Sequence, residues 1–276
     1  MNRFRRHRSK PISNRARHPI RQAWWDNYPG PHWSTMAGLS GQVQYRGMFG
    51  PRVGTTVNGQ HFHSGGPNAM DPPLHYAPPV LVDQIIVSRG PGGIQSGSAL
   101  IGSIDAILKG VPYGPTKAFA FHYDVSMLGR SVDQSHAIGG VAGIANERYR
   151  LYTMFSDENG HDIDFRMVDW PRPRATGKFS VSSRAWKRIM TDWSSDCAGT
   201  IRDRQGNPPF AMDIEYVATD FSQLAWRRSL GDSNLSLRLG YTDVDHGMNN
   251  FGLRPAPTNA LRYRRSLTGA ERSTDQ

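Results

Sequence analysis

A two-residue alternation of apolar and polar side chains runs through the chain from about residue 113 onward. The alternation is clearest in four segments, at 118–128, 148–155, 178–185 and 234–241. Successive side chains of a β-strand point to opposite faces of its sheet. The pattern therefore predicts a series of strands that have one apolar and one polar face.

Two kinds of sheet carry such a pattern. A soluble antiparallel sheet packs its apolar face on a core, whereas a transmembrane β-barrel turns that face to lipid and its polar face to a wet lumen. The polar faces here carry Arg, Lys, His and Asp with many Ser and Gly, which suits a lumen. The pattern alone leaves both structures open. The segment 213–227 alternates less cleanly, and we expect a β-bulge there.

The preceding part of the chain, from about 31 to 112, is rich in Gly and Pro and holds only short apolar runs. The candidate strands are the runs at 53–57, 81–87 and 101–108. Turn signals such as Pro72-Pro73 and Pro78-Pro79 separate them. This part is predicted to be a small mixed domain with short strands and long loops.

Charge and composition narrow the class of protein. The formal net charge is +10, but residues 1–21 carry eight basic and no acidic residues, and residues 22–261 carry 21 of each sign. The charge is therefore weak support for nucleic-acid binding by the body of the chain, and a like-charge arm is typically disordered. The single cysteine, Cys197, excludes an internal disulfide framework and a multi-cysteine zinc site.

Targeting signals are also absent from the pattern. No stretch approaches the roughly 18 apolar residues of a membrane-spanning helix. The basic N-terminus is followed by no apolar segment, so no secretory signal peptide is visible.

Two groups of motifs in the loop-rich part carry a family resemblance. The first is Arg46-Gly47 followed by Val57-Asn58-Gly59, and the second is Arg89-Gly90-Pro91 followed by the glycine-rich run 97–104. In order and spacing they resemble the plug domain of TonB-dependent outer-membrane receptors. The resemblance implies that a structural motif of the plug is formed by Arg46, Gly47, Gly59, Arg89, Gly90 and Pro91.

The resemblance covers roughly residues 31–254 and implies a mainly β fold. It predicts a small mixed α/β plug domain at 31–112 and an incomplete antiparallel transmembrane β-barrel of about six or seven strands at 113–254. We expect a basic disordered arm at 1–30 and an unrelated basic tail at 255–276. Large outer-membrane transporters close with about 22 strands, and lipid cannot satisfy open strand edges. The chain is thus expected to be a fragment that is not transport-competent alone.

Two stretches resemble the copper-receptor branch of this family. Met70 matches the methionine of a Cys-x-x-x-Met pair in a plug loop, where Gly66 takes the cysteine position, and His246 and Met248 match a His-x-Met pair of the barrel. Thioether and imidazole suit a soft metal such as Cu(I). Because the thiolate is missing, His61 and His63 are further candidate ligands. Core packing of the methionines and a solvated His246 are the alternative interpretation.

The function implied by the resemblance is uptake of a metal or metal chelate, copper or a ferric siderophore, across the outer membrane. Its partners would be the TonB energy-transducing complex, outer-membrane lipid and the cargo, with no specific nucleic acid. No catalytic cofactor and no enzymatic activity are expected. The alternative is a soluble β-rich binding protein whose basic arm binds nucleic acid.

Overall fold

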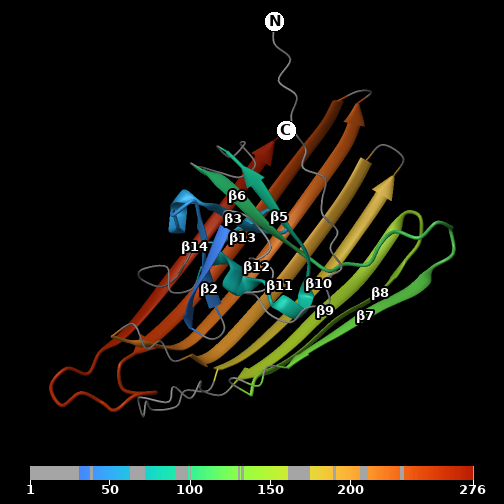
Figure 1. Ribbon diagram of the computed structural model, residues 1–276. Coiled ribbons are helices and arrows are strands. Elements are labelled where there is room, and N and C mark those ends of the chain that lie inside the picture. The colour runs from blue at the N-terminus through green and yellow to red at the C-terminus, as the bar shows by residue number, and fades with distance from the viewer. Residues whose placement is uncertain are drawn as a thin grey trace, which may run out of the picture.

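A computed structural model describes residues 31–37, 40–62, 72–90, 99, 101–129, 131, 134–160, 175–188, 191–205, 211–230 and 233–275. The chain forms a small N-terminal domain, called the plug below, and one large sheet, called the wall, and the plug lies against one face of the wall (Figure 1). The arm predicted at 1–30 lies outside the described residues. No helix in the described part is long and apolar enough to cross a membrane.

The plug is built on a four-stranded sheet with strand order β4-β3-β6-β5. Its strands are β3 (Gly54–Val57), β4 (Gln60–His61), β5 (Val82–Arg89) and β6 (Gly102–Leu108). β3 and β6 are parallel, and the other two pairs are antiparallel. The three strands predicted from the short apolar runs are confirmed.

Besides this sheet, the described residues of the plug form a hairpin and three short turns of 3-10 helix. The hairpin pairs β1 (Pro31–Ala37) with β2 (Ser40–Tyr45), and the turns are η1 (Gly50–Arg52), η3 (Pro73–Tyr76) and η4 (Pro79–Leu81). Each turn has a proline in its first positions. The described residues of the plug contain no α-helix, in contrast to the predicted mixed α/β domain. Proline lacks the N–H that a helix interior needs, which favours such short turns.

The wall is an eight-stranded antiparallel meander in which each strand pairs with the next along the chain. Its strands are β7 (Ala120–Gly129), β8 (His136–Ala145), β9 (Tyr149–Gly160), β10 (Ala175–Arg188), β11 (Thr191–Gln205), β12 (Asp213–Leu230), β13 (Ser233–Asn249) and β14 (Tyr263–Asp275). Seven of them precede residue 254, as predicted. The eighth, β14, pairs with β13 inside the segment that was expected to be an unrelated tail. β7 and β14 are the two edges.

The bulge expected in 213–227 is present at the start of β12. The register with β13 shifts between Ile214, which is opposite Met248, and Tyr216, which is opposite Gly247. The extra residue keeps both Ile214 and Val217 on the buried face, although regular alternation would put residues three positions apart on opposite faces.

The two faces of the wall differ as the alternation predicts. The outer face, away from the plug, exposes the side chains of Phe119, Phe121, Tyr123, Val125 and Met127 by 58% to 78%. It also exposes Tyr149, Leu151, Phe155, Leu235, Leu239 and Tyr241. On the inner face, Met154, Val217 and Val244 are at most 1% exposed and join the core formed with the plug.

The strand connections differ in length at the two ends of the wall. At one end, two or three residues link β8 to β9, β10 to β11 and β12 to β13. At the opposite end, the β9–β10 and β13–β14 connections span 161–174 and 250–262. The segment from β6 enters β7 at the end with short turns.

Candidate functional site

The interface between the plug and the strands β12 and β13 is polar at one place. Nε2 of Gln60 donates to the carbonyl oxygen of Tyr241 and to Oγ1 of Thr242, both at 2.8 Å. Nε2 of Gln223 donates to the carbonyl oxygen of Asn58 at 3.5 Å. The β3–β4 turn is therefore fixed to the inner face of the wall by side chains from both sides.

Aromatic packing continues this interface. The Phe62 ring stacks on Tyr76 of η3, with 4.9 Å between ring centroids, and meets Phe221 of β12 edge-on at 5.1 Å. All three rings are at most 8% exposed. The chain thus leaves the plug sheet at Phe62, and returns to it through η3, directly beside the wall.

Asp105 of β6 organises the β3–β4 turn. One carboxylate oxygen accepts hydrogen bonds from Oγ1 of Thr56 at 2.8 Å and from the amide of Gly59 at 2.9 Å. Burial raises the pKa of Asp105 above its ordinary value of 3.8, and these hydrogen bonds and the charge of Arg238 offset the effect only in part. The carboxyl of Asp105 therefore lies close enough to Arg238 of the wall to be affected by its charge.

Both the backbone conformation at position 59 and the lack of room for a side chain require glycine. Its φ is +74°, in the left-handed region. A Cβ at this position would lie 1.9 Å from Nη1 of Arg238. The guanidinium of β13 therefore rests directly on the turn, and no larger residue fits without moving it.

The predicted barrel ligands His246 and Met248 lie on the inner face of β13. They are 1% and 3% exposed, opposite Val217 and Ile214 of β12. Both lie near the end of the strand that leads into the 250–262 connection. The structure thus places an imidazole and a thioether on one buried face, and the prediction of a solvated His246 is not met.

Of the plug candidates, His61 lies within the described residues. Gln60 and Phe62 contact the wall, and the side chain of His61 between them points to the other side of the strand. His63 and Met70 lie outside the described residues. Within the described part of the chain, no three His, Cys, Asp or Glu side chains gather in a metal-binding group.

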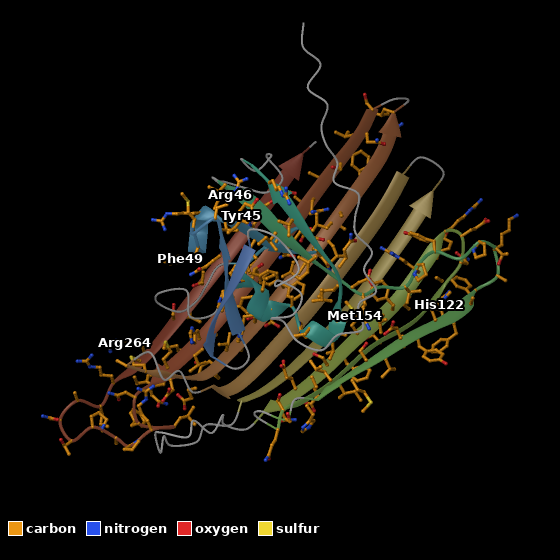
Figure 2. The ribbon with its side chains drawn as sticks, viewed as in Figure 1. Tyr45, Arg46, Phe49, His122, Met154 and Arg264 are labelled. Atoms are coloured by element: carbon orange, nitrogen blue, oxygen red, sulfur yellow. The ribbon has the colours of Figure 1, made fainter. Side chains whose placement is uncertain are left out.

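The first predicted structural motif forms a tight turn. Tyr45 and Met48 exchange backbone hydrogen bonds of 2.9 and 3.0 Å around Arg46 and Gly47, which both have positive φ. The Arg46 guanidinium lies 5.3 Å from the centroid of the Tyr45 ring. Figure 2 shows Tyr45, Arg46 and Phe49 together at one edge of the plug.

The second motif ends a strand. Arg89 is the last residue of β5, and the amide of Gly90 donates to the carbonyl oxygen of Ile101 at 3.2 Å. Pro91 lies outside the described residues. The geometry of Arg89 and Gly90 is that of residues that end a strand and begin a turn.

Sequence reasoning missed the side chains that order the end of the wall beside Met248. Nε of Arg254 donates to Asp213 at 2.7 Å, and the charge and hydrogen bonds of that carboxylate raise the pKa of Arg254. Oδ1 of Asn249 accepts from the amides of Phe251 and Gly252. Arg254 and Asp213 are 41 residues apart, so spacing alone gave no signal for this pair.

Arg238, Gln60 and Gln223 were missed as well. Each occupies a polar position of an otherwise regular strand or turn. The alternation placed Arg238 on the polar face, and this was the only signal available for it.

The family described as the TonB-dependent Receptor Plug Domain matches residues 21–104. No curated protein matches the chain. Among solved structures, a copper transporter, OprC, superposes with a TM-score of 0.74 at 22% sequence identity, covering 92% of this chain and 41% of the transporter.

Two siderophore receptors have the same fold. The siderophore receptor PirA from Acinetobacter baumannii has a TM-score of 0.69 at 14% identity, over 95% of this chain and 43% of PirA. A mutant of the ferric enterobactin receptor PfeA from Pseudomonas aeruginosa has a TM-score of 0.68 at 12% identity, over 93% of this chain and 44% of PfeA. The chain spans less than half the length of each of these structures. Residues 21–104 therefore match the plug domain of TonB-dependent receptors, and plug and wall together have the fold of the corresponding part of these solved structures.

Proposed function

We propose that this chain is the plug and adjoining wall of an outer-membrane receptor that takes up a metal or a metal chelate with energy from the TonB complex. The observation that carries the proposal is the position of the plug. It packs on the inner face of a sheet whose opposite face is apolar and exposed. A plugged lumen inside a lipid-facing wall has this arrangement.

The apolar belt of the outer face has a suitable height. From Phe119 to Met127 the extended chain advances about 26 Å at about 3.3 Å per residue. With the strand tilt of about 40° usual for such barrels, that is roughly 20 Å along the membrane normal, close to the 25 Å apolar band of outer-membrane barrels. On β13 the belt ends at Tyr241, after which Asp243 and Asp245 follow on the same face.

The lengths of the connections support an orientation. Outer-membrane barrels have short periplasmic turns and longer extracellular loops. The 250–262 connection then lies outside the cell, and His246 and Met248 lie near the extracellular end of the lumen. A cargo that arrives from outside would meet this end first.

The cargo site is proposed on His246, Met248 and Met70. The segment 63–71, which contains Met70, lies in sequence between Phe62 and η3, and Phe62 contacts both Tyr76 of η3 and Phe221 of the wall. Imidazole and thioether donors favour Cu(I). A ferric chelate is the second candidate cargo, since PirA and PfeA are siderophore receptors by name.

A soluble β-rich protein with a nucleic-acid-binding arm is the competing function. Exposure of Tyr123 by 74% and Met127 by 78%, among other apolar side chains of the same face, argues against a soluble sheet. We propose an outer-membrane location, no enzymatic activity and no catalytic cofactor.

The metal proposal is tested on the full chain folded in detergent micelles. Cu(I) affinity is measured under reducing conditions by competition with a coloured chelator. We expect His246→Ala and Met248→Ala each to weaken binding by at least about tenfold, and the control variants His136→Ala and Met48→Ala, whose side chains are exposed, to bind as the wild type does. Equal affinity of all variants would remove these residues from the site. If ferric enterobactin quenches the tryptophan fluorescence of the chain and Cu(I) does not bind, the cargo is a ferric chelate.

A further inference from the structure

The segment that joins the plug to the wall, residues 109–117, is bound along its length to the first three wall strands. It begins at Lys109, whose amide donates to the carbonyl oxygen of Leu81 at 2.7 Å. The Lys109 ammonium donates to Asp124 and to Ser126 of β7. The side chain of Lys109 is 14% exposed, so most of its surface is covered. The start of the segment is therefore tied both to the plug and to the wall.

A stacked arginine holds the middle of the segment. The guanidinium carbon of Arg150, on β9, lies 4.9 Å from the centroid of the Tyr113 ring and 5.7 Å from that of Tyr152. Nη1 of Arg150 also donates to the carbonyl oxygen of Val111 at 3.2 Å. Val111 is 2% exposed. A planar guanidinium can stack on rings and donate at its edge at the same time, which lysine cannot do.

The end of the segment adds backbone hydrogen bonds to the β8–β9 turn. The amide of Gly114 donates to the carbonyl oxygen of Asn146 at 3.0 Å, and the amide of Glu147 donates to that of Thr116 at 2.8 Å. Nδ2 of Asn146 donates to the carbonyl oxygen of Lys117 at 3.1 Å. The short turn thus binds the segment through three hydrogen bonds.

The turn itself is rigid. Oδ1 of Asn146 accepts from the amides of Arg148 and Tyr149 at 2.8 and 2.7 Å. Asn146 is 7% exposed. A buried side chain that caps its own turn with two hydrogen bonds gives the segment a fixed surface to bind.

We infer that residues 109–117, clamped by Arg150 and Asn146, form an anchor that keeps the C-terminal end of the plug attached to β7–β9. An exit of the plug from the wall as one rigid body would have to break these contacts. If the proposed transport function holds, a passage has to open by movement of plug segments that precede Lys109. The anchor itself does not depend on that function.

Amide hydrogen exchange on the full chain in detergent micelles tests the anchor. In the wild type, we expect amides of 110–118 to be protected well below the rate of unstructured peptide. In Arg150→Met, which keeps the side-chain length but loses the stacking and the hydrogen bond, these amides should exchange about tenfold faster. Exchange in β12 and β13 should not change.

The matched control is Arg148→Met. Its side chain is 56% exposed and pairs with the neighbouring Glu147 at 3.5 Å, so we expect wild-type exchange. Arg150→Lys should protect the segment only partly, because it keeps the charge without the stacked fork.

Two results would overturn the inference. One is unprotected exchange of 110–118 in the wild type, and the other is unchanged exchange in Arg150→Met. If Arg150→Met does not fold, the inference is tested by exchange in the wild type and by a second variant, Lys109→Met. Lys109→Met should make the segment open more often, and trypsin should then cleave faster after the exposed Lys117. Cleavage at the wild-type rate would contradict the anchor.

Discussion

Nε2 of Gln60 in the plug donates a hydrogen bond of 2.8 Å to Oγ1 of Thr242 in the wall, although 182 residues separate the two. The same nitrogen also donates to the carbonyl oxygen of Tyr241. One side chain therefore joins the plug to β13 at two acceptors.

Replacing Gln60 with leucine should loosen this contact. The hydroxyl of Thr242, a residue 3% exposed, would lose its donor, at a cost of about 1–3 kcal/mol. Pulse proteolysis across a urea series measures the change in stability. Gln84→Leu, at a half-buried position of β5, is the control. Equal midpoints for wild type and Gln60→Leu would mean that the contact contributes nothing.

A methyl group at Gly139 of β8 should push the plug away from the wall. A Cβ there would lie 2.6 Å from Cγ2 of Val80 in η4. Overpacking of this kind costs about 1–3 kcal/mol. We expect Gly139→Ala to lower the unfolding midpoint in urea, and Gly129→Ala, which has nothing within 4 Å, to leave it unchanged.

The same substitution can be rescued. In the double variant Gly139→Ala with Val80→Ala, the new methyl group occupies the space of the removed side chain. The loss of stability in the double variant should then be smaller than the sum of the losses in the two single variants. If the two losses of stability add exactly, the methyl group introduced at Gly139 does not clash with Val80.

The stability of the plug should depend on the titration of Asp105. Because burial raises its pKa, the folded state binds this proton more tightly than the unfolded chain does. The stabilising contribution is complete below 3.8, the ordinary value, and is lost as the pH rises through the raised pKa. The urea midpoint should fall across that window in the wild type and lose this step in Asp105→Asn. Asp83→Asn, exposed on β5, is the control, and an unchanged step in Asp105→Asn would assign it to another group.

A charge in the middle of the apolar belt should oppose membrane folding. Tyr123 lies at the centre of the exposed row of β7. Arginine near the bilayer midplane of a barrel costs about 2–4 kcal/mol. We expect Tyr123→Arg to reduce the yield of folding into lipid vesicles, while Ala256→Arg in the exposed 250–262 connection folds as the wild type does. Equal yields would place Tyr123 outside lipid.

The alternation predicted the strands of the wall best where one face is apolar throughout. The segment 234–241 lies inside β13, which continues to Asn249. Beyond Tyr241 the outer face carries Asp243 and Asp245, so the apolar half of the pattern disappears while the strand continues. β14 was missed for a related reason, since arginines such as Arg265 interrupt its alternation.

β8 carries little alternation because glycines on its inner face make room for side chains of η4 and of β9. Gly139 admits Val80 and Leu81, and a Cβ on Gly143 would meet Tyr152 at 2.4 Å. Glycine at such positions gives no hydropathy signal, although the packing requires it. Only the three-dimensional contact explains the residue.

The candidate site was predicted in part. His246 and Met248 came from a family resemblance, and the structure places both on the buried inner face of β13. The contacts of Gln60 with Thr242 and of Arg150 with Tyr113 depend on how the plug sits in the wall. Sequence spacing contains no information on such pairs. The metal-ligand roles of all five candidates stay predictions, those of His246, Met248, Met70, His61 and His63.

Site-specific fluorescence in vesicles of brominated lipid tests the central claim most directly. In a Cys197→Ser background, a single label would be placed by Phe121→Cys, Leu239→Cys or, for the inner face, Thr242→Cys. We expect strong quenching by brominated chains at residues 121 and 239 and none at 242, where the plug covers the wall. Equal quenching at all three positions, or quenching at 242 alone, would contradict a lipid-facing outer surface with a plug on the opposite face.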